Sequence, residues 1–379
     1  PEKISHPSLQ PVRFGLLHGS AEIKLPSNRL RFLLNSGQNL PASATMDSFT
    51  QLTFGAACGQ AILGKEVGRK AAIWGALLGT LPDLDVFIPL GSPVDDFVYH
   101  RGFSHSLFLL ALISPLIAKL ITTIHQDTKH LYIKWVLFSF VVLEGSVLLD
   151  LLTIYGTQIF WPFDTTPHAV PALFIIDPLF TLPIFVGVLA SLLFKNHNPK
   201  GHRLNAVGLT LSLTYLAWAV GAGVFVKNRV NEKLAQQGVS YSQFTFCPAP
   251  FTTLLWRVVG IDNEQYFETY YSLFDGNEPL TVNYYPRNLN LIKGIEEHAP
   301  IVKVKDFTKG YFALSDKNGS VTISDLRMGS QPDYVFQFKV AKTNNSLAVP
   351  VSAQRFETTR DWSRLPWLWK RIWNSANES

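Results

Sequence analysis

The sequence predicts a polytopic α-helical membrane domain followed by a smaller antiparallel β-rich soluble domain. First, 47% of the 379 residues are hydrophobic and only 16% are charged, whereas soluble globular proteins carry about 25% charged residues. Second, apolar segments follow one another closely from residue 48 to residue 226, which indicates membrane spans. Third, short runs of alternating apolar and polar residues follow from about residue 230, and such alternation is typical of strands.

These changes in composition divide the chain into four expected parts. They are a non-native or disordered extension (1–45), a transmembrane helical domain with an Asp/His site (46–228), a β-rich soluble domain (229–360) and an aromatic and basic tail (361–379). The first part lacks the charged start and apolar run of a signal peptide. Met46 opens a sequence of different character, so we expect it to be the natural start. A transit-like extension is the alternative.

Six apolar segments are expected within the helical domain. They lie at about 49–64, 71–90, 105–124, 132–153, 172–194 and 204–226. Several approach the roughly 20 residues that cross a bilayer, which favours spans over the buried helices of a soluble bundle. Gly55 and Gly59 in the first segment suit close packing of helices in lipid.

The distribution of basic residues predicts an orientation in the membrane. Lys and Arg gather in the loops at 65–70, 119–134 and 195–203, whereas the loop at 154–171 has neither. The positive-inside rule therefore places the basic loops in the cytoplasm. The Asp/His residues and the soluble domain would then lie on the non-cytoplasmic side, although the basic residues at 227–233 run against this scheme.

The soluble domain is expected to be an antiparallel sheet. The stretch 310–326 predicts a hairpin with Asn318-Gly319 at its turn, and the alternation in 334–340 predicts a strand. Two more strands are expected within 265–275 and 279–286. We identify no catalytic signature here, so the domain is expected to cap, scaffold or recognise.

The tail at 362–373 combines four Trp residues with Arg and Lys. Aromatic and basic residues together are typical of a helix that lies in the headgroup zone of a bilayer. A terminal helix that packs on the β-rich domain is the alternative.

Aspartate and histidine residues are concentrated between residues 80 and 106. Asp83 and Asp85 would point apart on a helix, so their convergence needs the break that Pro82 makes plausible. His100 and His105 are five residues apart, and a junction between loop and helix can bring both rings together. Carboxylate and imidazole are the ligands of hydrolytic metal sites, and they are costly to bury between membrane segments. Two solvated loops that happen to carry charge are the alternative.

Four further residues have candidate roles. We expect Ser104 to cap the third segment, which places His105 in its first turn. Arg101 could hold a phosphate or carboxylate oxygen in a bidentate manner, or form a salt bridge with a headgroup or within the loop. Asp150 is either a further ligand, a base that orients a metal-bound water, or a group that caps a helix or forms a hydrogen bond between helices. Asp177 either supports a histidine or complements a helix dipole.

These residues lie in motifs that resemble the membrane-bound metal-dependent hydrolase family, the YdjM-like inner-membrane proteins of bacteria. The matching stretches are 46–85, HRGFSHS at 100–106, LLDLLTIYGTQIFWPF at 148–163 and IIDPLFTLP at 175–183. The match continues through YYSLFD at 270–275, FTKGYF at 307–312 and DLRMG at 325–329. It therefore covers nearly everything after Met46.

The resemblance implies metal-dependent hydrolysis in a multi-pass protein of the bacterial inner membrane. A distant similarity to zinc-dependent phospholipase C and related nucleases implies phosphoester substrates. One departure concerns the position four residues before Asp150, where family members usually carry a histidine and this chain has Ser146. Serine is a poor zinc ligand, so Glu144 or a water fills the gap, or metal affinity is reduced, or this member is not catalytic.

We therefore expect a hydrolase that cleaves an ester or phosphoester, with a lipid-linked substrate, by means of metal-activated water. The expected ligands of the divalent metal, zinc, are Asp83, Asp85, His100, His105 and Asp150, and the expected assisting residues are Arg101 and Asp177. The alternative is a non-catalytic membrane scaffold with a vestigial or structural Asp/His cluster. The lipid bilayer is the expected partner, and no basic run indicates nucleic acid.

Overall fold

The structure, a computed structural model, describes residues 44–194, 199–344, 347–356 and 362–374. The extension expected at 1–45 therefore lies almost wholly outside the described residues. The chain divides into two units, Pro1–Met46 and Asp47–Ser379. All that follows concerns the second unit.

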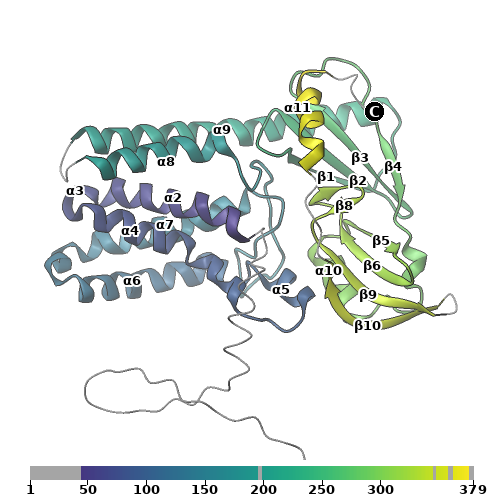
Figure 1. Cartoon of the computed structure of the whole chain (residues 1–379), viewed down its shortest axis with the longest axis horizontal. Coiled ribbons are helices and arrows are strands. Elements are labelled where there is room, and N and C mark those ends of the chain that lie inside the picture. Colours follow the sequence, from purple (N-terminus) through teal and green to yellow (C-terminus); the bar gives the residue numbers. More distant parts are fainter. Residues whose placement is uncertain (1–43, 195–198, 345–346, 357–361, 375–379) are drawn as a thin grey trace, which may run out of the picture. The chain divides into compact units, whose positions relative to one another are not determined.

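The first part of this unit is helical (Figure 1). The longer helices are α2 (Ala44–Ile62), α4 (Arg69–Thr80), α6 (Leu107–Ile124), α7 (Tyr132–Leu151), α8 (Pro178–Leu193) and α9 (Pro199–Gln236). Between them lie α3 (Gly64–Val67), α5 (Pro93–Tyr99) and the 3-10 helices η2 (Pro82–Phe87), η3 (Phe103–His105) and η4 (Gln126–Leu131). The helical class expected for this part is confirmed.

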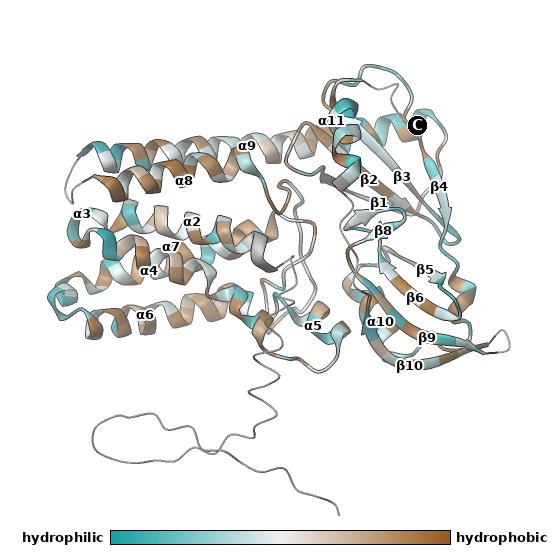
Figure 2. Ribbon diagram, viewed as in Figure 1, coloured by the Kyte–Doolittle hydropathy of each residue, from teal (hydrophilic) through white to brown (hydrophobic). Residues whose placement is uncertain are grey.

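Among the described residues, three helices are long and apolar enough to cross a membrane. They are Leu107–Ile124, Gln126–Leu151 and Pro199–Gln236. The apolar helix α8 is shorter. Hydrophobic residues cover much of these helices (Figure 2). The expected segment at 71–90 is helical only to Thr80, and its second half forms η2. The total of six spans stays a prediction.

Helices α2 and α4 lie so close together that their glycine positions leave no room for a side chain. A Cβ atom added to Gly55 would lie 2.1 Å from the carbonyl oxygen of Gly75. One added to Gly59 would lie 2.2 Å from the carbonyl oxygen of Ala71. Small residues thus let the two backbones meet, as they do in membrane helix pairs.

The second part is β-rich and antiparallel, as expected. Among the described residues, one sheet has the strand order β1-β2-β3-β4 and another the order β10-β9-β6-β5, and β7 pairs with β8. The first sheet consists of β1 (Gln243–Pro248), β2 (Leu255–Ile261), β3 (Gln265–Ser272) and β4 (Asn283–Pro286). The others consist of β5 (Phe312–Asp316), β6 (Ser320–Asp325), β7 (Gly329–Ser330), β8 (Asp333–Tyr334), β9 (Gln337–Asn344) and β10 (Leu347–Arg355).

The expected hairpin at 310–326 is confirmed. Strands β5 and β6 pair with Asp316 opposite Val321. Asn318 and Gly319 at the turn have φ values of 54° and 74°, which a type I′ turn requires. The strand expected at 334–340 is instead divided, because β8 ends at Tyr334 and β9 begins three residues later in another sheet.

The two parts are joined by α9 and by a shared apolar core. Near its end, α9 buries Val226 and Val230 against Trp256 and Phe267 of the first sheet. A second core joins α5 to the other sheet and to α10 (Ala299–Phe307). The β-rich part therefore packs against the end of the helical part that carries the Asp/His residues.

Candidate metal centre

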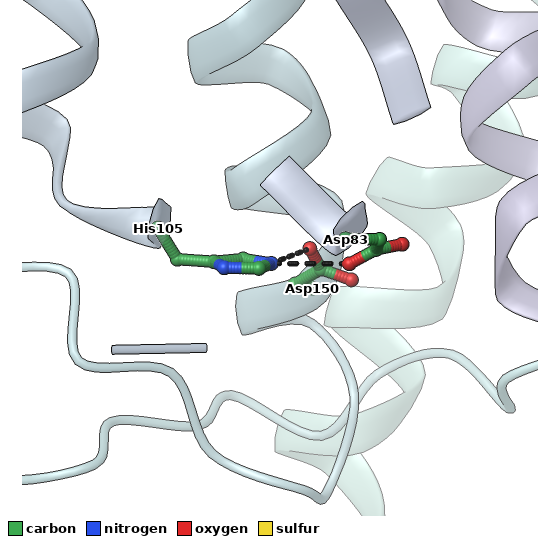
Figure 3. Close-up of side chains that lie close together, drawn as sticks. All are labelled: Asp83, His105 and Asp150. Atoms are coloured by element: carbon green, nitrogen blue, oxygen red, sulfur yellow. Dashed lines mark hydrogen bonds and ion pairs between the residues drawn. The ribbon is translucent and has the colours of Figure 1, made fainter. Parts of the chain in front are cut away.

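Asp83, His105 and Asp150 come from three separate elements and meet at one point (Figure 3). Asp83 lies in η2, His105 ends η3, and Asp150 lies in the last turn of α7. The Nε2 atom of His105 is 3.2 Å from an oxygen of Asp83 and 3.2 Å from an oxygen of Asp150. One ligand atom of each residue lies within 4.8 Å of the other two, so one metal ion could contact all three.

Local breaks in the helices position these side chains. The end of α4 is followed at Pro82 by a 3-10 turn, which turns Asp83 away from the α4 axis. The prediction that Ser104 caps the third segment is wrong, because Ser106 accepts the hydrogen bond from Leu109 N and caps α6. His105 therefore precedes α6 instead of lying in its first turn.

Asp85 and His100 form a pair beside the three-residue group, and neither is a member of it. His100 Nδ1 lies 2.7 Å from Asp85 Oδ1. Burial alone would raise the pKa of Asp85, but the hydrogen bond and charge of His100 outweigh it and lower the pKa to about 2. Asp85 is therefore an anion at neutral pH.

Ser104 connects this pair to the metal group. Its Oγ donates to Asp85 Oδ2 at 2.6 Å and lies 2.9 Å from His105 Nδ1. Because the serine proton is directed to the carboxylate, the serine oxygen accepts from Nδ1–H of His105. In the neutral imidazole this leaves the lone pair of Nε2 free for a metal, and such outer contacts orient many metal-binding histidines.

His105 is fully buried between two carboxylates. Burial would lower its pKa, but hydrogen bonds to Asp150 and Asp83 outweigh burial and raise the pKa to about 9. Without a metal the imidazole is therefore protonated at neutral pH. A metal ion that binds Nε2 must displace this proton.

Asp150 is held by two residues from other elements. Arg101 Nη2 lies 2.9 Å from Asp150 Oδ1, and Gln51 Nε2 donates to both carboxylate oxygens at 2.9 and 3.0 Å. Arg101 is only 4% exposed and has a φ of 62°, a conformation that residues other than glycine seldom adopt. The structure thus places Arg101 as a partner of Asp150.

Gln51 is the residue that sequence reasoning missed. It is 1% exposed, and its Oε1 has no hydrogen-bond partner among the described residues. The only signal in the sequence is a glutamine within the apolar segment at 49–64. Its buried oxygen makes Gln51 a candidate for a contact with a bound ion or a water.

Asp177 lies outside the metal group. It accepts hydrogen bonds from the backbone N–H groups of Leu179 and Phe180 and so caps α8. Its other oxygen accepts from Tyr215 OH at 2.8 Å. These contacts are those of a helix cap. None of them involves a histidine, so they do not support the expected role of Asp177 as the partner of a histidine.

Comparison with protein families finds a similarity in the helical part. The sequence model of the YdjM inner membrane protein family matches residues 46–225. The helical part of the chain is therefore similar to the members of this family. The match includes every residue of the candidate metal centre.

One curated relative is similar to part of the chain. It is a protein of Bacillus subtilis (strain 168) described as "Uncharacterized protein YfhP", 30% identical over 156 residues. The similar region makes up 39% of this chain and 45% of the relative. No solved structure is significantly similar to the chain.

Helix α7 has Ser146 one turn before Asp150, where a second candidate ligand would lie. The Ser146 hydroxyl instead donates to the carbonyl oxygen of Val142 at 2.9 Å. Glu144 is buried but is not a member of the metal group. Of the four explanations for Ser146, a contribution from Glu144 therefore has no geometric support.

The charges of the centre suit a divalent cation. The buried or nearly buried carboxylates of Asp83, Asp85 and Asp150 face one fixed positive charge, that of Arg101. The three carboxylates and the guanidinium together carry a net charge of −3 + 1 = −2. A divalent ion can balance this charge. A carboxylate and imidazole donor set fits zinc and similar transition metals.

Proposed function

We propose that the protein is a membrane-bound metal-dependent hydrolase that cleaves an ester or phosphoester. The observation that carries this proposal is the convergence of Asp83, His105 and Asp150, whose ligand atoms lie within 4.8 Å of one another. Three protein ligands and an open position are the arrangement of catalytic zinc sites. We propose zinc as the metal, because two carboxylates and one imidazole suit it.

The roles of the residues follow from their contacts. Asp83, His105 and Asp150 would hold the ion, and Gln51 and Arg101 keep Asp150 in place from either side. When bound, a divalent cation polarises the ester or phosphoryl group and lowers the pKa of a coordinated water to about 7. Asp85 acts through Ser104 to hold the imidazole of His105, and it also binds His100.

The surroundings of Asp83 suit a lipid-linked substrate. The Asp83 side chain is 13% exposed and that of His100 is 25% exposed, so the centre opens toward these residues. Beside them, Leu84 is 49% exposed and Phe87 is 65% exposed. Exposed apolar side chains beside the centre favour a substrate with an acyl or isoprenoid chain.

A second candidate is a non-catalytic scaffold in which Asp/His contacts only stabilise the fold. Two observations favour it. Arg101 already neutralises Asp150, and the Ser146 hydroxyl is bonded within its own helix. In this candidate His105 keeps its proton and replaces the metal as the positive centre between the two carboxylates.

Metal content separates the two candidates. Protein purified in detergent, dialysed against zinc and analysed by elemental mass spectrometry is expected to retain about one ion per chain. His105→Ala and Asp150→Asn should each lose it, while His168→Ala, outside the centre, should keep it. A chromogenic phosphodiester and a chromogenic ester then test cleavage.

A variant that loses metal because it is misfolded must be distinguished from one that loses only the metal ligand. Size-exclusion profiles and far-ultraviolet circular dichroism of the variants should match those of the wild type. Wild-type protein that is folded but binds no divalent metal would contradict the hydrolase and favour the scaffold.

A further inference from the structure

Three exposed aromatic side chains lie together where the C-terminal helix meets the turn after β3. Phe274 is 57% exposed, Trp369 is 62% exposed and Trp373 is 58% exposed. The Phe274 and Trp373 rings stack at 4.9 Å, and the centroids of Trp369 and Trp373 are 6.3 Å apart. We call these three residues the aromatic patch. Contiguous exposed aromatic surface in a folded protein marks a contact site.

The patch is held rigidly by the opposite face of its helix, α11 (Leu365–Trp373). Arg371 makes two hydrogen bonds of 2.8 Å to the carboxylate of Asp275. Ser272 donates to the carbonyl oxygen of Ile372 at 2.6 Å. The alternative expectation for this tail, a terminal helix that packs on the β-rich domain, therefore agrees with these contacts. Its contact with a bilayer stays a prediction.

The strand ends that carry α11 lie next to the membrane-length helix α9. Ser272 pairs with Leu255 across β3 and β2, and the next residue, Trp256, packs on α9. A Cβ added to Gly223 of α9 would lie 3.2 Å from the Trp256 ring. Because α9 enters the β-rich part from its membrane-length apolar stretch, this end of β2 is close to the bilayer.

The turn before β2 provides a second indication that this end of β2 lies close to the bilayer. Thr253 Oγ1 lies 3.2 Å from Tyr215 OH in α9, and Tyr215 donates to Asp177, the cap of the apolar helix α8. The Phe251 ring contacts the Phe174 ring with centroids 5.8 Å apart. This turn therefore lies level with the beginning of α8, where a bilayer surface is expected.

We infer that the aromatic patch inserts into the headgroup region of the bilayer that holds the apolar helices. Trp and Tyr residues gather at this depth in membrane proteins, because their rings are both apolar and polar. The exposed Lys370 lies between Trp369 and Trp373 in the sequence, and a cation there complements anionic lipid. This contact would fix the β-rich part against the membrane surface, and it does not depend on the metal centre.

Fluorescence quenching in nanodiscs tests this inference on the full chain. The two cysteines, Cys58 and Cys247, are replaced by serine, and Trp373→Cys carries an environment-sensitive fluorophore. Nanodiscs contain phosphatidylethanolamine and phosphatidylglycerol, with and without a headgroup nitroxide lipid. Leu347→Cys, which is 69% exposed on β10, is the matched control.

The label at 373 should be quenched at least about twofold more than the label at 347, with emission shifted to the blue. Lys370→Cys provides a second label on α11 in case the first variant is misfolded. Equal quenching at all sites would overturn the inference. Energy transfer between labels on separate chains, without lipid quenching, would also overturn it and assign the patch to a second copy.

Discussion

At the scale of residues, the hydroxyl group of Ser104 connects the carboxylate of Asp85 to the candidate metal centre by hydrogen bonds. Ser104 donates to Asp85 and accepts from His105, so the serine determines which imidazole nitrogen can bind a metal. Asp85 was expected to be a ligand, yet its nearest oxygen lies 3.9 Å from His105 Nδ1, on the side of the ring away from Asp83 and Asp150. Its contacts are those of an orienting residue.

We predict that Ser104→Ala weakens metal binding. Removal of the hydroxyl leaves Nδ1 of the buried His105 without its acceptor and frees the ring to rotate. Loss of such an outer contact typically costs about 10- to 100-fold in metal affinity. Competition with a chromogenic zinc chelator measures this affinity in detergent.

Ser106→Ala is the matched control, two residues away. Ser106 caps α6 and donates to Trp161 O, so its loss should cost about 1 kcal/mol of folding stability with metal affinity nearly unchanged. Equal metal affinities for the two variants would rule out the orienting role of Ser104.

At the scale of elements, glycines determine how near α2 and α4 approach. This pair matters to the centre because α2 carries Gln51 and α4 leads into Asp83. A Cβ on Gly79 would lie 2.4 Å from the backbone oxygen of Gln51. The close contact therefore helps to place two of the residues around the metal position.

We predict that Gly75→Ala destabilises the protein although alanine is the better helix former. Its Cβ would lie 2.1 Å from the backbone oxygen of Gly55, so the helices must separate. Overpacking of this kind costs about 1–3 kcal/mol. Thermal unfolding in detergent, followed by circular dichroism, should show a lower midpoint.

Gly221→Ala provides the opposite case. Gly221 lies within α9, and an added Cβ meets nothing within 4 Å. This substitution should be neutral or stabilising by up to about 1 kcal/mol. Similar midpoints for both variants would show that close approach of α2 and α4 is not needed.

At the scale of the whole molecule, the β-rich part packs against the loops that bear the centre. Phe97 of α5 contacts Phe307 and Phe336 at ring distances of 4.7 and 4.6 Å. Tyr155 donates to the carbonyl oxygen of Phe97 and lies beneath the guanidinium of Arg101 at 5.2 Å. A continuous set of contacts thus runs from the second sheet to the partner of Asp150.

An ion pair between Asp95 of α5 and Lys303 of α10 joins the two parts and should make stability depend on pH. Burial raises the pKa of Asp95, but the hydrogen bonds from Lys303 and Ser92 outweigh it and lower the pKa. The hydrogen bond to Asp95 raises the pKa of Lys303. The stabilisation is therefore complete between about pH 4 and pH 10. It is lost as the pH falls through the folded pKa of Asp95 or rises through that of Lys303.

We predict that Lys303→Met lowers the unfolding midpoint at pH 7 and that this difference from wild type disappears in acid. The expected effect is below about 1 kcal/mol, because the pair is partly exposed and water screens it. Unfolding curves from pH 3 to pH 8 measure it. An unchanged difference at pH 3 would show that the charge on Asp95 is irrelevant. Lys70→Met, which removes a more exposed pair with Asp127, is the control.

The sequence by itself determined the membrane class, the β-rich second part, the NG hairpin and the concentration of Asp and His. Periodicity, turn chemistry and the cost of buried charge are local properties, so they are visible without coordinates. Only the tertiary structure decided which residues meet. Asp150 lies next to Asp83 and His105, and Asp85 and His100 form a pair beside them. Asp177 caps a helix instead. The tertiary structure also revealed Gln51 and the role of Arg101. Such contacts join residues up to 99 positions apart, and their geometry depends on helix packing that no local pattern encodes.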